Sequence, residues 1–562
     1  MRNNYFSTLI LIFISFLSVC YGQSYNMRLL GTWDNNNLPA NNGGYTYSEV
    51  FGFEMNGKEY AVIGSTQGTH IIDITDPSNL VEVDFVPARY QGNVTHRDFD
   101  VHNGHLYMVC DQATSSLQIA DLSYLPDSVH VVYDSTDLLV RSHNIFIDLA
   151  NDIMYSCGGN KTTGSNELRL IDISTPASPF LIVDCADGIS WWSSNVGYVH
   201  DIYVRDNIAY TNDDDAMHII NFSNPLSPVI LGSISSYVDK GYNHSGYLSA
   251  DDTTYVMCDE THAKRVKFMD VSTPSTILVT DVEGTGIPNF FQIAHNPIIK
   301  DNFAYVSYYY DGVQVYDIKD KYNVSNVAYY DTYQGANASG GEGCWGVYPL
   351  LPSGKILASD RKDGLFVLQH LTTPTIEFDV TNQTYFEFDG LQKAYFSLSN
   401  ELDDTVRVTV DIDVTSSATL NSDYTLSTIS PKTFTFSPGE TKDSVEFLLV
   451  DNPDVESLET LIFNITSTIN GEIGANSSDT IFIQDNEVLS LTERDNNSFK
   501  IFPNPANPGQ VITFDKSYSY QVLDVSGKVV LVGNAKQFST TILSSGAYLV
   551  QYGTKTEKLI IN

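Results

Sequence analysis

Residues 69–77 read Thr69-His70-Ile71-Ile72-Asp73-Ile74-Thr75-Asp76-Pro77, a short apolar strand that ends in an acidic residue, a threonine and a proline. The same plan returns six times along the chain, with anchor positions at Asp121, Asp172, Asn221, Asp270, Asp317 and Gln369. Counted from Asp73, successive anchors lie 47 to 52 residues apart. Such a constant spacing indicates seven copies of one structural unit.

Each unit is rich in β-branched and aromatic residues and is punctuated by turn formers, which is typical of a four-stranded propeller blade. A single four-stranded sheet cannot bury both of its faces, so the blades are expected to stack radially around a channel. The sequence therefore predicts a seven-bladed β-propeller over residues 23–374. The segment Met27–Trp33 resembles the outer strand of a blade but follows no inner strands, and we expect it to complete the seventh blade.

The acidic anchors are interpreted as turn caps rather than as catalytic or ligand-binding residues. An Asp side chain can accept hydrogen bonds from its own backbone two residues on, and the proline that follows prevents further strand pairing. We expect this role for Asp73, Asp121, Asp172, Asp270 and Asp317.

Composition and the first residues indicate an exported protein. Among 562 residues the formal net charge is −38 and we find no basic patch, which argues against a nucleic-acid partner. Residues 1–22, with an apolar run from Leu9 to Val19, are predicted to be a signal peptide cleaved after Gly22. Five cysteines follow, an odd number that cannot all pair with one another. We interpret Cys110, Cys157 and Cys258 as small buried apolar residues, with a soft-metal site as the alternative.

Five histidines recur at the start of successive inner strands, and inner strands line the channel of a propeller. They are His96, His143, His200, His244 and His295, and Asp201 follows His200 directly. Imidazoles with a nearby carboxylate could hold a transition metal in the channel or supply a general base. Alternatively, each histidine binds the backbone of the neighbouring blade and sets the blade spacing. Repetition in five blades favours this second interpretation.

The signal peptide, the Leu/Val-x-Ile-x-Asp-x-Ser/Thr-x-Pro repeat and the recurrent inner-strand histidines together resemble the choice-of-anchor B family of secreted bacterial proteins with LVIVD-type repeats. The resemblance covers residues 27–374 and implies the propeller architecture. It implies no settled substrate or reaction, so the function has to be argued from the site itself.

Residues 375–487 alternate apolar and polar positions between turns, which predicts a β-sandwich. The stretches Ser422–Thr425, Phe434–Glu440, Asp451–Thr460 and Gln484–Glu487 resemble a Calx-beta domain in order and spacing. The resemblance implies calcium binding by Asp423, Asp451, Glu456 and Asp485, with Asp389 where the family usually has Glu. Asn452 departs from the family pattern, and a metal-free spacer is the alternative.

Residues 488–498 are interpreted as a linker to a C-terminal domain of residues 499–562, predicted to be a small β-sandwich. The blocks Phe499–Asn507, Tyr520–Val530, Gly546–Val550 and Lys558–Asn562 resemble the type A sorting domain of the type IX secretion system of Bacteroidetes. This resemblance implies contact with the type IX secretion machinery and export across the outer membrane. It also implies removal of the domain, followed by release or by attachment to surface lipopolysaccharide.

The sequence thus predicts an all-β protein, secreted or held on the cell surface, and leaves two functions open. The leading hypothesis is a platform that binds a glycan or protein ligand. The alternative is a metal-dependent hydrolase or lyase that uses the channel histidines His143, His200, His244 and His295 with Asp201. No serine-hydrolase, zinc-protease, phosphate-loop or dinucleotide motif supports a familiar enzyme class.

Overall fold

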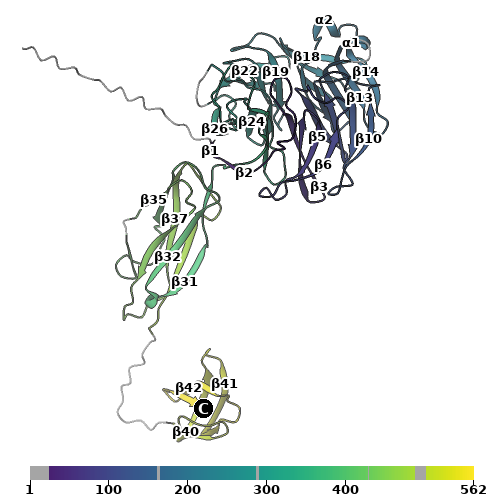
Figure 1. Cartoon of the computed structure of the whole chain (residues 1–562). Coiled ribbons are helices and arrows are strands. Elements are labelled where there is room, and N and C mark those ends of the chain that lie inside the picture. Colours follow the sequence, from purple (N-terminus) through teal and green to yellow (C-terminus); the bar gives the residue numbers. More distant parts are fainter. Residues whose placement is uncertain (1–23, 161–164, 286–289, 428–429, 488–500) are drawn as a thin grey trace, which may run out of the picture. The chain divides into compact units, whose positions relative to one another are not determined.

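A computed structural model describes residues 24–562 except 161–164, 286–289, 428–429 and 488–500 (Figure 1). The predicted signal peptide, residues 1–22, and the predicted linker, residues 488–498, lie outside the described residues. The chain divides into two compact units, Met1–Asp451 with Glu459–Gln484 and Asn452–Leu458 with Asp485–Asn562. A search of the described residues for an apolar helix long enough to cross a membrane finds none.

Seven antiparallel sheets follow one another along the first unit, and each corresponds to one sequence repeat. The repeat strand is the third strand of every sheet. The first three sheets consist of β3 (Tyr47–Met55), β4 (Lys58–Ser65), β5 (Gly68–Asp73) and β6 (Val81–Pro87); β7 (Arg97–His102), β8 (His105–Cys110), β9 (Leu117–Asp121) and β10 (His130–Ser135); and β11 (Asn144–Asp148), β12 (Ile153–Asn160), β13 (Ser165–Asp172) and β14 (Phe180–Asp184).

The fourth to seventh sheets repeat this arrangement. They consist of β15 (Asp201–Arg205), β16 (Ile208–Asn212), β17 (Met217–Asn221) and β18 (Val229–Ile234); β19 (Asn243–Leu248), β20 (Thr254–Asp259), β21 (Val266–Asp270) and β22 (Leu278–Glu283); β23 (Pro297–Lys300), β24 (Phe303–Ser307), β25 (Val313–Asp317) and β26 (Ser325–Tyr330); and β27 (Cys344–Tyr348), β28 (Ile356–Asp360) and β29 (Gly364–His370). The first strand of the seventh sheet, β27, lies against the first strand of the first sheet, β3.

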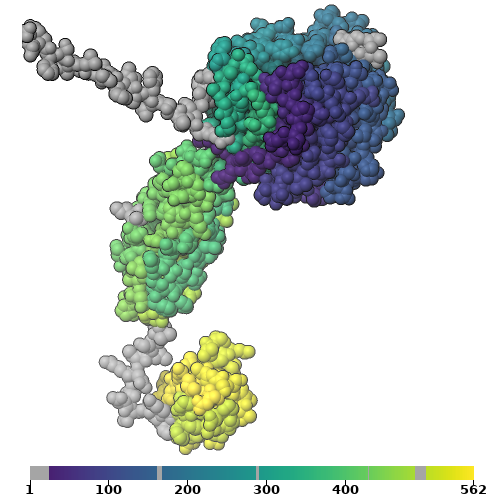
Figure 2. Space-filling view, viewed as in Figure 1, coloured from purple at the N-terminus to yellow at the C-terminus, as the bar shows by residue number. Residues whose placement is uncertain are grey.

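The N-terminal segment completes the last two sheets. Strand β2 (Met27–Trp33) pairs antiparallel with β29, with Met27 opposite His370, so the prediction that it supplies the outer strand of the seventh sheet is confirmed. Strand β1 (Ser24–Tyr25) also pairs with β26 of the sixth sheet, which the sequence did not predict. Figure 2 shows this purple segment against the green segment of the later sheets.

The turns that end the repeat strands are capped as predicted. In each, a backbone N–H two residues on donates to the anchor side chain at 2.7–3.0 Å, and the pairs are Thr75 to Asp73, Ser123 to Asp121, Ser174 to Asp172, Ser223 to Asn221, Ser272 to Asp270 and Lys319 to Asp317. The five described cysteines are all buried and unpaired, which agrees with the interpretation of Cys110, Cys157 and Cys258 as small apolar residues.

Two short helices interrupt the pattern between the third and fourth sheets, α1 (Cys185–Gly188) and α2 (Trp192–Asn195). Neither was predicted, because a helix of four residues carries no readable apolar period. Asp184 caps α1 by accepting from the N–H of Asp187. Trp192 is fully buried in the core between the third and fourth sheets.

Two five-stranded sheets follow and share one apolar core, as a sandwich requires. One consists of β34 (Tyr424–Leu426), β36 (Lys442–Leu449), β32 (Leu391–Leu398), β30 (Thr375–Phe378) and β38 (Glu472–Ile473). The other consists of β31 (Asn382–Phe386), β39 (Ser478–Gln484), β37 (Glu459–Ile469), β33 (Val406–Ile412) and β35 (Lys432–Phe436). A single 3-10 turn, η1 (Glu387–Asp389), connects β31 to β32.

The C-terminal domain differs from the predicted small sandwich. Its described strands form one four-stranded antiparallel sheet in the order β41 (Val529–Ser539), β40 (Val511–Asp524), β42 (Gly546–Tyr552) and β43 (Lys555–Ile561). The ladder between β40 and β41 is irregular from Thr513 to Tyr518. An irregularity in a long strand bends it, so residues before and after it, Ile512 and Val522, reach the same core.

Candidate functional site: a circle of five imidazoles

The five predicted histidines occupy the same place in five successive sheets, at or just before the first strands β7, β11, β15, β19 and β23. Their rings lie side by side. Centroids of consecutive rings are 4.6, 4.2, 4.3 and 4.6 Å apart from His96 through His143, His200 and His244 to His295. Trp345 of β27 closes the series, 4.3 Å from His295 and 5.4 Å from His96. We call these six rings the aromatic circle.

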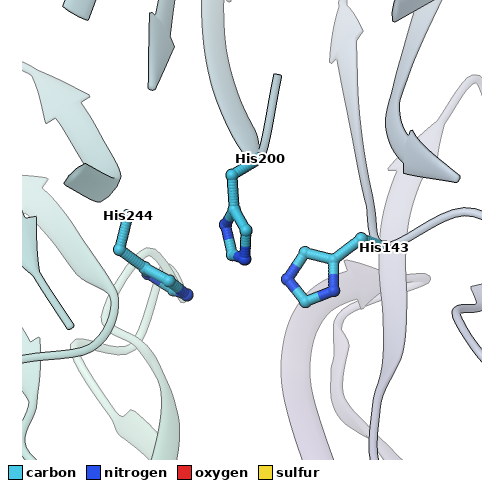
Figure 3. Close-up of side chains that lie close together, drawn as sticks. All are labelled: His143, His200 and His244. Carbon is cyan, nitrogen blue, oxygen red and sulfur yellow. The ribbon is translucent and has the colours of Figure 1, made fainter. Parts of the chain in front are cut away.

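Three neighbouring histidines bring their nitrogen atoms together (Figure 3). One nitrogen from each of His143, His200 and His244 lies within 4.8 Å of the other two, and the three side chains come from three different sheets. A tetrahedral ion with metal–nitrogen bonds of about 2.1 Å needs these nitrogens about 3.4 Å apart. The observed limit of 4.8 Å is wider than this spacing, so one shared ion would require the three nitrogens to lie closer than that limit.

Outer hydrogen bonds orient two of these rings. Nδ1 of His143 lies 2.7 Å from Oδ2 of Asp111, and Nδ1 of His244 lies 3.2 Å from the backbone oxygen of His295. Both partners are acceptors, so Nδ1 carries the proton and Nε2 of the neutral ring keeps its lone pair. Nδ1 of His200 is buried without a partner among the described residues. In their neutral forms His143 and His244 therefore each keep a lone pair on Nε2.

His295 is held in the same way as His244. Its Nδ1 lies 2.6 Å from the backbone oxygen of Trp345, so both rings make the contact to a neighbouring sheet that the packing interpretation predicts. In contrast, the indole N–H of Trp345 donates to Nδ1 of His96 at 3.1 Å. The proton of neutral His96 is therefore on Nε2, and this atom offers no lone pair to a metal. The circle thus contains both hydrogen bonds between neighbouring sheets and histidine nitrogens that keep a lone pair.

The environment keeps most of the circle neutral. Burial, followed by the charges of neighbouring histidines, lowers the pKa of His96, His200 and His295 well below the ordinary value, and burial also lowers the pKa of His244. Burial acts in the same direction on His143, but the hydrogen bond and charge of Asp111 outweigh it and raise its pKa. Neutral imidazole is the form that binds metal ions.

Asp201 does not join the histidine nitrogens but lines a cavity of about 480 Å³ bounded by the first strands of the sheets. Its polar lining includes Glu49, Asp98, Asp100, Asn144, Asp201 and Asn296, and its apolar lining includes Phe51, Phe146, Tyr203, Tyr247 and Tyr348. Hydrogen bonds cross between sheets here, from Asn144 to Asp201 at 2.6 Å and from Asn296 to Glu49 at 2.9 Å. Burial raises the pKa of Glu49, Asp100 and Asp201 to about 7.

Two further charged side chains at the circle were missed from the sequence. Glu260 directly follows β20; its Oε2 lies 3.6 Å from Nε2 of His244, and its other oxygen accepts a hydrogen bond from the Tyr309 hydroxyl. Arg361 directly follows β28 and stacks on Trp345. Asp111 directly follows β8 in the same way. A charged residue immediately after the second strand of a repeat was the available signal.

The five predicted calcium ligands fall into the two compact units. Asp389, Asp423 and Asp451 belong to the first, where Asp389 accepts from the N–H of Phe386 at 2.7 Å and Asp423 from the N–H of Thr419. Glu456 and Asp485 belong to the second, where the N–H of Glu456 donates to Asp485 at 2.7 Å. Calcium binding by these residues stays a prediction.

Comparison with known proteins identifies the C-terminal domain. Residues 500–562 match the family described as secretion system C-terminal sorting domain. The protein is accordingly one that the type IX secretion system exports, it interacts with that machinery, and it is secreted or displayed at the cell surface. No curated protein sequence matches the chain.

Two solved structures are similar to part of the chain. The crystal structure of the apo form of the Calx CBD1 domain is 14% identical, with a TM-score of 0.19, over 20% of this chain and 99% of that one. The crystal structure of CBD12 from CALX1.2 is also 14% identical, with a TM-score of 0.20, over 33% of this chain and 81% of that one.

Proposed function

We propose that the seven sheets close into a seven-bladed β-propeller with the aromatic circle at one level of its channel. The closed series of six ring contacts, the contact of β27 with β3 and the completion of the seventh sheet by β2 support this closure. The repeat and the circle also support membership of the choice-of-anchor B family. Residues 375–487 would then carry the propeller as a separate sandwich module, and residues 499–562 would deliver it.

The function that this geometry supports best is ligand binding through a transition-metal ion held by His143, His200 and His244. The carrying observation is the convergence of one nitrogen from each histidine within 4.8 Å. Imidazole suits zinc, copper, iron and nickel, and a carboxylate hydrogen-bonded to one ligand histidine is the usual outer partner in such sites. An ion with three protein ligands keeps a position open for an external ligand. The protein would act as an exported, metal-dependent binding platform.

The metal content of the full secreted chain tests this function. Purified protein equilibrated with zinc and then dialysed should retain one equivalent, measured by elemental analysis. The double variant His200→Ala/His244→Ala should retain none, whereas the control His130→Ala, an exposed histidine stacked on Tyr124, should retain the wild-type amount. Wild-type protein that holds no zinc, copper, nickel, iron or manganese above the double variant would rule the site out.

The alternative function, a metal-dependent hydrolase or lyase, is favoured by Glu260. A carboxylate 3.6 Å from one metal-binding imidazole, supported by the Tyr309 hydroxyl, is placed to act as a general base on a substrate at the ion. Glu260→Gln should then keep the metal and abolish turnover of any substrate found by screening glycans and peptides. Metal binding without turnover in the wild type leaves the binding platform as the function.

A further inference from the structure

A buried positive charge lies on the side of the aromatic circle opposite the proposed metal ligands. Trp345 is the sixth ring in a series in which His200 is the third, so it lies across the circle from the middle ligand. The Arg361 guanidinium stacks on Trp345 at 4.4 Å from the ring centroid and on Tyr45 at 3.6 Å. Arg361 is only 4% exposed. Its place after β28 matches that of the acidic residues Asp111 and Glu260 after β8 and β20, with the charge reversed.

Burial of Arg361 outweighs the charges of nearby acidic side chains: it lowers the pKa of the guanidinium, although Glu260 and Asp360 act in the opposite direction. Arg361 takes part in none of the ion pairs among the described residues, and the one hydrogen bond found there for its side chain runs from Nη1 to the backbone oxygen of Gly341 at 2.6 Å. Its Nε is buried with no partner among the same residues. A guanidinium presents five N–H donors in a fixed plane that matches an oxyanion, and a buried charge is unfavourable until such a partner is present.

A second unsatisfied donor lies on the same part of the circle. His96 is 3% exposed, and because its Nδ1 accepts from Trp345, its proton is on Nε2. No hydrogen bond to that buried Nε2 is found among the described residues, although the ring also has a hydrogen bond with the backbone of His143. Arg361 and His96 thus both contact Trp345, one by stacking and one by hydrogen bonding, and both keep an N–H donor unused. Two donors that flank one indole suit an acceptor with several oxygens.

We propose that the ligand of this site is an oxyanion-bearing molecule, with a carboxylate or a sulfate held by Arg361 and the Nε2–H of His96. Its other end would face the ion held by His143, His200 and His244, so this half of the inference rests on the proposed metal site. The aromatic circle would then have a metal ion on one side and the Arg361 guanidinium on the other, so both sides would be positively charged. A chain with a net charge of −38 thereby selects an acidic ligand at one buried place.

The inference can be tested by calorimetric titration of the zinc-loaded full chain. The three ligands are glucuronate, glucose 6-sulfate and neutral glucose, which share one sugar ring and differ in the acidic group. At least one acidic sugar should bind at least 10-fold more tightly than glucose, and comparison of the two distinguishes carboxylate from sulfate. Arg361→Gln should weaken that binding by about 10- to 100-fold, since hydrogen bonds to charged groups contribute on this scale. Arg205→Gln is the matched control, because Arg205 is already paired with Asp252.

The outcomes separate this inference from the metal site. Loss of acidic-sugar binding in Arg361→Gln with unchanged zinc content supports the anion site. Acidic-sugar binding that persists in His200→Ala/His244→Ala supports the anion site and removes the metal from the mechanism. Since Arg361 packs in the core, His96→Gln provides a second variant that should weaken the same sugar if Arg361→Gln does not fold. Equal binding of glucose and both acidic sugars by the wild type, or no binding of any, overturns the inference.

Discussion

Asp111 Oδ2 lies 2.7 Å from Nδ1 of His143, and the two residues belong to adjacent sheets. The carboxylate fixes the proton on Nδ1 and turns Nε2 toward the nitrogens of His200 and His244. In metal sites such outer carboxylates orient the ring and raise its basicity. This pair therefore connects the second sheet to a site formed by the third, fourth and fifth.

Asp111→Asn should weaken zinc binding by about 10- to 100-fold without loss of fold, because the amide no longer stabilises the ligand tautomer by charge. Competition with a chromophoric zinc chelator measures the affinity. The matched control is Glu82→Gln, which alters a similar pair with Nδ1 of His70 at 2.7 Å outside the circle. Equal zinc affinity in wild type and Asp111→Asn would contradict the assigned role of Asp111.

Met27 tests whether the N-terminal strand is part of the core. It is 2% exposed and packs with Leu368 and other residues of the sixth and seventh sheets. Met27→Ala should lower the free energy of unfolding by about 2–5 kcal/mol through lost burial and a cavity. Leu29→Ala, on the same strand but 40% exposed, should change it by less than about 0.5 kcal/mol. Guanidinium denaturation compares them, and equal midpoints would mean that β2 contributes little to stability.

The repeats made the sheets predictable from the sequence. The site residues that do not recur in every repeat could not be predicted in the same way. Asp73 and its counterparts act through contacts two residues away, so a local pattern sufficed for the turns. The five histidines came together because equal positions in equal units face the same space. Trp345 takes their place in the seventh sheet, and its bond to His96 joins residues 249 positions apart, which no local pattern reveals. Glu260 and Arg361 occupy one equivalent position, directly after the second strand of their repeats, but their opposite charges hide that equivalence.

The cavity carboxylates predict a pH dependence of stability. Burial raises the pKa of Asp100 to about 7 in the folded chain, well above its ordinary value of 3.8. Between these values the folded state binds more protons than the unfolded state, so this contribution to stability is complete below about pH 4 and is lost as the pH rises to 7. Glu49 acts in the same direction.

Asp100→Asn keeps an oxygen to accept from the N–H of Ile147 but removes the titration. At pH 8 this variant should be more stable than the wild type by about 1–3 kcal/mol, and the difference should vanish toward pH 4. Thermal unfolding from pH 4 to 8 measures both trends. Asp127→Asn, an exposed carboxylate outside the cavity, should follow the wild-type curve. A wild type that gains stability between pH 5 and 7 relative to Asp100→Asn would contradict the assignment.

Removal of the sorting domain should abolish export. A chain that ends at Ser498 lacks the residues that match the secretion-system sorting domain, so it should stay inside the outer membrane. Fractionation of producing cells and immunoblotting of the medium, surface and periplasm measure its location. A chain without residues 375–487 but with the C-terminal domain is the control for deletion itself, and it should still leave the cell. Arrival of the Ser498-terminated chain at the surface would show that another segment directs export, because loss of folding alone would hinder export rather than restore it.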